Sequence, residues 1–173
     1  MGAGILPMAF TKNGNTITLY ILLGQERDKK NKLWCDFGGS EHHNELTFAA
    51  AIREGYEETN GLLGDINELE NIVSKNLLLH MSFNSYTSYV YRAPYDRSFP
   101  KLFDNSNKFA ERNLKYVVSN SKNGLFEKVQ VKWFRLSHFK DPNNRKILRN
   151  FYNAHIEYLL KHEEEIKNAI ISF

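Results

Sequence analysis

Three glutamates are spaced so that they could act together on a cation. Glu54, Glu57 and Glu58 stand at positions i, i+3 and i+4 of a segment, residues 47–59, that is patterned as a helix. At 3.6 residues per turn, that spacing places all three carboxylates on one helix face. Like charges at this spacing repel one another and weaken a helix. Because Mg²⁺ and similar hard cations prefer oxygen ligands, the triplet predicts a divalent cation site.

The segment that holds these glutamates has turn signals at both ends. Gly38-Gly39 lies ahead of it, and Asn60-Gly61 follows it. Asn and Gly tolerate the left-handed conformation found just past helix ends, so we expect the helix to stop there. The side opposite the carboxylates is mostly apolar and available for packing. Its residues are Phe48, Ala49, Ile52, Gly55, Tyr56 and Thr59.

Strand and helix patterns alternate along the rest of the chain. Residues 15–23 show the two-residue periodicity of a strand. Further strands are predicted at 33–37, 76–83, 85–92 and 128–134, and a long helix at about 143–168. Residues 94–124 are long for a simple connection, with a helix candidate at 108–118, and predict a lid or insertion. This interleaving favours an α/β or α+β fold.

The totals fit one globular domain spanning residues 1–173. The net charge of +3 is mild and permits a polyanionic ligand. Cys35 is the single cysteine, which excludes a disulfide framework and a cysteine-based zinc site. No apolar run approaches the roughly 18 residues of a membrane span, and the first residues lack a basic signal region. We therefore expect a cytoplasmic protein with no membrane partner.

The glycine-plus-glutamate pattern resembles the Nudix box, which would occupy residues 39–61. Its fixed positions match in type and spacing. They are Gly39, Glu45, Arg53, Glu54, Glu57 and Glu58. A Trp-containing strand enters the box, and Glu127 lies six residues before Trp133-Phe134, as in many members. The resemblance covers roughly residues 15–140. It implies an α/β/α sandwich around a curved mixed β-sheet.

Three positions depart from the usual box. Gly55 stands where a hydrophobic residue is expected, which costs a helix about 1 kcal/mol relative to Ala and removes a packing side chain. Asn60 replaces the terminal glycine, a mild change because Asn also adopts the left-handed conformation. Gly61 stands where another hydrophobic is expected, and we expect Leu62 to supply that contact.

Nudix enzymes hydrolyse a diphosphate linkage between a nucleoside and another group, and the resemblance implies that activity here. It implies Mg²⁺ as cofactor, with Mn²⁺ as an alternative, held by Glu54, Glu57, Glu58 and the Gly38 carbonyl. A bound Mg²⁺ neutralises phosphate charge and lowers the pKa of a bound water. The substrate would be a nucleotide-type small molecule.

The remaining box residues have supporting roles in the family. Arg53 orients the glutamates by charge-assisted hydrogen bonds. Glu45 fixes the turn ahead of the helix, together with Gly39. The general base varies between members and is either a box glutamate or one from a distant loop. Glu127 is the best-placed distant candidate, and Glu111 in the 94–124 segment is the second.

Two other functions remain open on the sequence. Residues 92–115 and 140–161 carry an excess of Lys and Arg, which would suit an RNA backbone and hence hydrolysis at an RNA 5′ end. A Nudix-fold module that binds nucleotide or RNA without hydrolysis is the alternative of another class, although such modules generally lose the box carboxylates. Oligomeric state is left open.

Several conspicuous residues have simpler interpretations. Glu163-Glu164-Glu165 follows no glycine turn and predicts a solvent-exposed face. His42-His43 has no third soft ligand at a recognisable spacing, so we interpret it as loop. Cys35 is expected in the core. The tyrosines of 86–91 are expected mainly as sheet residues.

Overall fold

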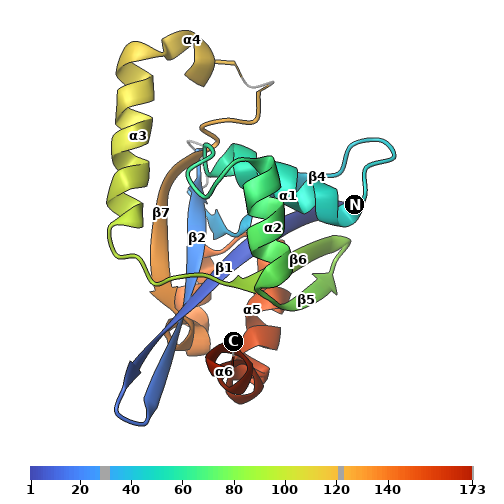
Figure 1. Cartoon of the computed structure of the whole chain (residues 1–173), viewed down its shortest axis with the longest axis vertical. Helices are drawn as coiled ribbons and strands as arrows, with labels where there is room; N and C mark the ends of the chain where they lie inside the picture. The colour runs from blue at the N-terminus through green and yellow to red at the C-terminus, as the bar shows by residue number, and fades with distance from the viewer. Residues whose placement is uncertain (28–31, 121–122, 173) are drawn as a thin grey trace.

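The computed structural model describes residues 1–27, 32–120 and 123–172. Within those residues it contains a seven-stranded mixed sheet with helices on both faces (Figure 1). The strands are β1 Gly2–Asn13, β2 Thr16–Glu26, β3 Trp34–Cys35, β4 Phe37–Ser40, β5 Leu77–Phe83, β6 Tyr86–Arg92 and β7 Lys128–Arg135. The α-helices are α1 Thr47–Glu58, α2 Ile66–Lys75, α3 Phe99–Asn113, α4 Lys115–Val118, α5 Asn153–Lys161 and α6 Glu163–Ile171.

Strand β1 organises the sheet. It pairs in parallel with β6, from Gly2 opposite Tyr86 to Met8 opposite Arg92, and antiparallel with β2 and β4. The sequence reading did not predict this strand. It is buried on both faces, so its apolar residues form a nearly continuous run with no two-residue alternation. The single strand predicted at 33–37 is instead two strands, β3 paired with β2 and β4 paired with β1, and β4 continues through the double glycine to Ser40. The remaining strands were predicted close to their observed positions.

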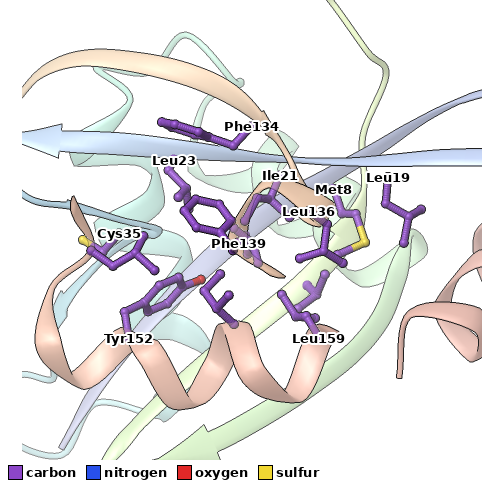
Figure 2. Close-up of a cluster of buried hydrophobic side chains, with 14 of the residues drawn as sticks. Met8, Leu19, Ile21, Leu23, Cys35, Phe134, Leu136, Phe139, Tyr152 and Leu159 are labelled. Atoms are coloured by element: carbon purple, nitrogen blue, oxygen red, sulfur yellow. The ribbon is translucent and has the colours of Figure 1, made fainter. Parts of the chain in front are cut away.

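Two hydrophobic clusters cover the two faces of the sheet. On one face, α1, α2 and the start of α3 pack around Phe37, Leu69 and Phe103. On the other face, the C-terminal helices pack against alternating residues of β2 (Figure 2). Leu19, Ile21 and Leu23 point into this second cluster, as their spacing predicts, whereas Leu22 points to the first.

The predicted single helix at about 143–168 is wrong. The chain forms 3₁₀ segments at Leu136–Lys140, Pro142–Ile147 and Asn150–Tyr152, and then α5 and α6, which are separated at His162. Leu148 and Arg149 are extended because this stretch bridges to β3, where Arg149 N donates to the Trp34 carbonyl at 3.0 Å. A sheet contact therefore replaces the helix turn there.

Residues 94–124 contain more helix than the sequence predicts. The predicted helix at 108–118 instead begins at Phe99 and breaks at Leu114, and α3 runs beside β7 at the sheet edge (Figure 1). The Asn107 side chain donates to the Lys128 and Val129 carbonyls at 2.9 and 3.2 Å, which ties α3 to that strand. A lid role for this segment stays a prediction.

Helix α2 was also missed, although Asp65 and Glu68 form a capping box at its start. Across the described residues, every helix is too short or too polar to cross a membrane.

Candidate active site

The chain enters the site through two glycines of β4. A side chain at Gly38 would collide with the Tyr86 hydroxyl and the Ala3 carbonyl, because β4 lies directly against β1. A Cβ at Gly39 would lie 2.5 Å from the Glu54 carboxylate. Gly38 therefore lets β4 pack against β1 and Tyr86, and Gly39 lets a carboxylate of α1 approach the backbone closely.

Arg53 connects three of the predicted carboxylates. Its Nε and Nη2 donate to the two oxygens of Glu45, each at 2.9 Å. Its Nη1 donates to Glu54 at 2.8 Å and to Glu57 at 3.2 Å, and Nη2 also donates to the Ser40 carbonyl at 3.0 Å. These hydrogen bonds hold Glu54 and Glu57 against one guanidinium, and an orienting role of Arg53 in catalysis stays a prediction.

Glu45 closes the turn ahead of α1. Its Oε2 accepts from the His42 backbone N–H at 2.8 Å while its carboxylate pairs with Arg53. The hydrogen bonds from Arg53 lower the pKa of Glu45 to about 2, and the same contacts raise the pKa of Arg53. The pair is ionised over the ordinary pH range and fixes the entrance of the helix.

The structure brings most of the predicted site residues together around one cleft of about 380 Å³. They are Gly38, Gly39, Arg53, Glu54, Glu57, Glu58 and Glu127. Burial raises the pKa of Glu57, and nearby Glu54 adds to that rise. Burial and then Glu54 raise the pKa of Glu127 as well. Glu127 is therefore electrostatically coupled to the box although it lies far away in the sequence.

Glu58 differs from its two partners because it faces the protein interior. Its side chain is 4% exposed; Oε2 accepts from the Gly38 N–H at 2.7 Å, and Oε1 lies 3.0 Å from Lys128 Nζ. Burial raises the pKa of Glu58 to about 8, and Lys128 opposes that rise. Both oxygens face donors, so the geometry is that of an ionised carboxylate. A role for Glu58 as metal ligand stays a prediction.

Sequence reasoning missed several residues of the cleft. Glu26, Arg149 and Gly124 line it. Lys128 is fully buried next to it and joins Glu26, Glu58 and Arg149 in an ion-pair network. Burial lowers the pKa of Lys128, but Cys35, Glu58 and Glu26 raise it more, so the net pKa lies well above its usual value. The strand that carries Glu26, β2, was predicted from its sequence, but it continues three residues beyond the predicted end.

The donor atoms fit a hard divalent cation in an open site. Glycines leave space around two carboxylates, since a Cβ at Gly39 would meet Glu54 and a Cβ at Gly124 would collide with Glu57. Among the described residues, no group of three or more His, Cys, Asp or Glu side chains is placed to hold a metal ion. Mg²⁺ is commonly held by one or two carboxylates, with waters and substrate phosphates as its other ligands. Glu54 and Glu57 meet that requirement.

No family model matches the chain, and no curated protein sequence matches it significantly. Solved structures do resemble it. A C. elegans Ap4A hydrolase in a binary complex is 13% identical with a TM-score of 0.51, and the match covers 95% of this chain and 99% of that one. A mutT/nudix family protein from Listeria innocua is 16% identical with a TM-score of 0.50, covering 99% and 96%. The chain has the Nudix fold. The expected mixed sheet between two helical layers is thereby confirmed.

Within this Nudix fold, the glycine at position 55 has a packing reason. A Cβ there would collide with the Ile5 side chain of β1. The side chain expected from the helix is thus replaced by one from the central strand, and packing is not lost at this position. The lower helix propensity of glycine accompanies the close approach of α1 to the sheet.

The other two departures of the Nudix box are also explained. Asn60 and Gly61 have φ of 54° and 69°, the left-handed conformation expected after the helix. The Asn60 side chain accepts from Phe126 N at 2.8 Å and donates to Asn107 at 3.0 Å. Asn60 thereby anchors the loop that carries Glu127. Leu62 packs against the α1-side cluster, as expected.

Other predicted residues lie outside the cleft or have structural surroundings. Glu111 pairs with Arg27 at 2.9 Å and does not line the cleft. His42 lines the cleft entrance, and His43 is an exposed loop residue. Cys35 is buried as expected, and burial raises the pKa of its thiol.

Proposed function

We propose that this chain is a Mg²⁺- or Mn²⁺-dependent hydrolase that cleaves the diphosphate linkage of a nucleoside diphosphate joined to another group. One observation supports this most directly. Glu54 and Glu57 accept from the same Arg53 nitrogen inside a cleft of about 380 Å³ that Glu127 also lines. Several carboxylates, whose oxygens can bind a metal ion, thus share a single arginine in a space large enough for phosphate groups.

Each residue has a definite task in this proposal. Glu54 and Glu57 hold the divalent cation, and the Gly38 carbonyl and Glu58 are the further ligands that the box predicts. A bound cation would neutralise the phosphates and lower the pKa of its water. Arg53 fixes the orientation of the two outer carboxylates, because each loses rotational freedom when it accepts from the guanidinium.

Glu127 is the proposed general base. It is exposed to the cleft, and its pKa is raised by burial and by Glu54. A carboxylate whose pKa is closer to neutral accepts a proton from water more readily. The loop that holds Glu127 is fixed to the end of α1 through Asn60, and its carbonyl accepts from Arg27 N at 2.9 Å. Glu127 would take the proton as water attacks phosphorus.

The comparison supports a starting point for the substrate. The C. elegans protein of similar fold is an Ap4A hydrolase, which acts on a dinucleoside polyphosphate. Dinucleoside polyphosphates therefore join nucleoside triphosphates, ADP-ribose, NADH, nucleotide sugars and short capped RNA in the panel to be tested. Capped RNA covers the alternative that the basic stretches suggest.

The deciding experiment is mass spectrometry of products from this panel with Mg²⁺ or Mn²⁺. Wild type and Glu57→Gln are incubated in parallel, after circular dichroism shows that both are folded. We expect a cleaved diphosphate product from wild type that Glu57→Gln makes at a strongly reduced rate. Equal product from both proteins would overturn the site assignment. No product from wild type would favour the binding module.

A further inference from the structure

Lys128 places a buried positive charge against two carboxylates that line the cleft, Glu26 and Glu58. The residue is fully buried at the start of β7, and its ammonium lies 2.7 Å from Glu26 and 3.0 Å from Glu58. It also donates to Cys35 Sγ at 3.3 Å. A buried ammonium without partners would be strongly destabilising. These partners account for its burial. One of them, Glu58, is also a carboxylate of the Nudix box.

The sheet is shaped around this lysine. The register of β2 and β7 shifts between Gln25 and Glu26, and after that shift Lys128 points inward as Val131 does. Gly24 gives the stem its space, because a Cβ there would lie 2.9 Å from Lys128 Cγ and Cδ. A β-bulge that redirects a side chain is a common device next to active sites. The position of the ammonium is therefore built into the backbone.

The inner part of the cleft is balanced in charge. Glu26 and Glu58 face Lys128 and Arg149, and Arg149 lies 3.2 Å from Glu26. Two carboxylates thus meet two cations without any metal ion. A second cation placed here would have to displace the ammonium of Lys128, which is fully buried.

The outer part of the cleft is not balanced. Glu45, Glu54 and Glu57 share one cation, Arg53. Glu127 adds a further negative charge, since it is coupled to Glu54 and Glu57. Only this outer part has an excess of negative charge that a divalent cation would neutralise.

We propose that Lys128 is a built-in cation of the site: its ammonium holds Glu58 and Glu26, and the divalent cation binds at Glu54 and Glu57 without Glu58. This rests on the proposed metal site and revises its ligand set. Lys128 is a positioning residue, and it limits the cleft to one divalent cation in the absence of substrate.

The test counts bound Mn²⁺, by electron paramagnetic resonance of free Mn²⁺, in proteins without substrate. Wild type is expected to bind one ion. Lys128→Met keeps the aliphatic stem and removes the ammonium from Glu26 and Glu58, leaving Arg149 as the only cation of this pair of carboxylates among the described residues, so it should bind one additional ion. The double variant Lys128→Met with Glu58→Gln removes the inner charge pair, while the introduced amide oxygen still accepts from the Gly38 N–H. It should return to one ion with wild-type affinity, whereas Glu57→Gln should lose at least tenfold in affinity.

Two results would overturn the inference. A double variant that loses Mn²⁺ affinity as Glu57→Gln does would make Glu58 a ligand. A folded Lys128→Met protein that binds no extra Mn²⁺ would reduce Lys128 to a structural role. If Lys128→Met alone fails to fold, the double variant decides, because replacing a buried ion pair by uncharged groups is often tolerated. The assay needs no substrate. An expected Mn²⁺ pattern without turnover on the panel would therefore refute only the proposed hydrolase.

Discussion

Two glutamate triplets in this chain have the same charge and different surroundings. In α6, Glu163, Glu164 and Glu165 occupy the first turn, where the helix dipole favours negative charge. In α1, Glu54 and Glu57 lie in the last turns, where the dipole opposes it. The α6 glutamates also have more counter-charge, with Lys140 and Lys167 as cationic partners.

The difference shows which feature of an acidic cluster points to function. Glu164 and Glu165 are 82% and 80% exposed, and water screens their charges. Glu163 is only 13% exposed, so the predicted solvent-exposed face does not include it, and it pairs with both Lys140 and Lys167. Glu54 and Glu57 are 14% and 23% exposed, and Arg53 is their shared partner. A cluster that is partly buried, poorly neutralised and at the wrong helix end is stabilised by a bound cation. A cluster whose exposed members are screened by water and whose buried member is paired with two lysines has no such requirement.

The largest effect should come from removing one carboxylate of the α1 triplet. Glu57→Gln is expected to lower kcat/KM more than about 100-fold. Loss of a residue that only orients a metal ligand typically costs about 10- to 100-fold, so a larger loss would mark Glu57 as a ligand itself. Glu164→Gln, the same change in the exposed triplet, should leave kcat/KM unchanged. Steady-state kinetics on the substrate found in the panel measures both. Equal effects would mean that the two triplets do not differ in function.

Removing the counter-charge of each triplet is the next comparison. Arg53→Met frees three carboxylates and should lower kcat/KM about 10- to 100-fold, as loss of a ligand-orienting residue does. Lys167→Met removes the partner of Glu163 and Glu164 in α6 and should not change kcat/KM. Arg53→Lys separates charge from geometry, because an ammonium cannot reproduce the guanidinium fork. Full activity of Arg53→Lys would contradict an orienting role.

The packed side of α1 gives a smaller effect, on stability. Gly55→Ala should destabilise the protein by about 1–3 kcal/mol through overpacking against Ile5, despite a gain of about 1 kcal/mol in helix propensity. Asn168→Ala in α6 is the matched control, since it is exposed and raises propensity without a collision. Urea unfolding at pH 7 measures both. A more stable Gly55→Ala protein would show that α1 can move away from β1.

The sequence predicted the local parts of this molecule better than the long-range ones. The spacing of Glu54 and Glu57 and the left-handed residues Asn60 and Gly61 depend on a few neighbouring positions, so they were readable. Lys128 was not, because its inward direction results from a bulge between two strands about 100 residues apart. The break at Leu148 depends likewise on β3. Such features depend on which distant strands pair with one another, and a local sequence pattern does not predict that pairing.

The smallest expected effect concerns acid stability and compares Glu45 with Glu163. The pKa of Glu45 falls from 4.5 to about 2 through Arg53. Burial raises the pKa of Glu163, but Lys140 and Lys167 lower it more. A lowered carboxyl pKa stabilises the folded state above the unfolded pKa of 4.5, and that contribution is lost as pH falls through the folded pKa. Wild type should therefore lose stability relative to Glu45→Gln between pH 4.5 and about 2.

Urea unfolding in EDTA across that pH range measures the difference for each glutamine variant against wild type. For Glu163→Gln the same sign is expected with a smaller size, because two flexible lysines hold Glu163 whereas a fork of two guanidinium nitrogens holds Glu45. If the difference in unfolding free energy between wild type and Glu45→Gln did not change with pH, the pKa of Glu45 would be the same in the folded and unfolded states. Arg53 would then not stabilise the Glu45 carboxylate. The entrance turn of α1 would then be fixed by Gly39 and the β4 backbone, and the α1 network would lose its structural advantage over the pairs of α6.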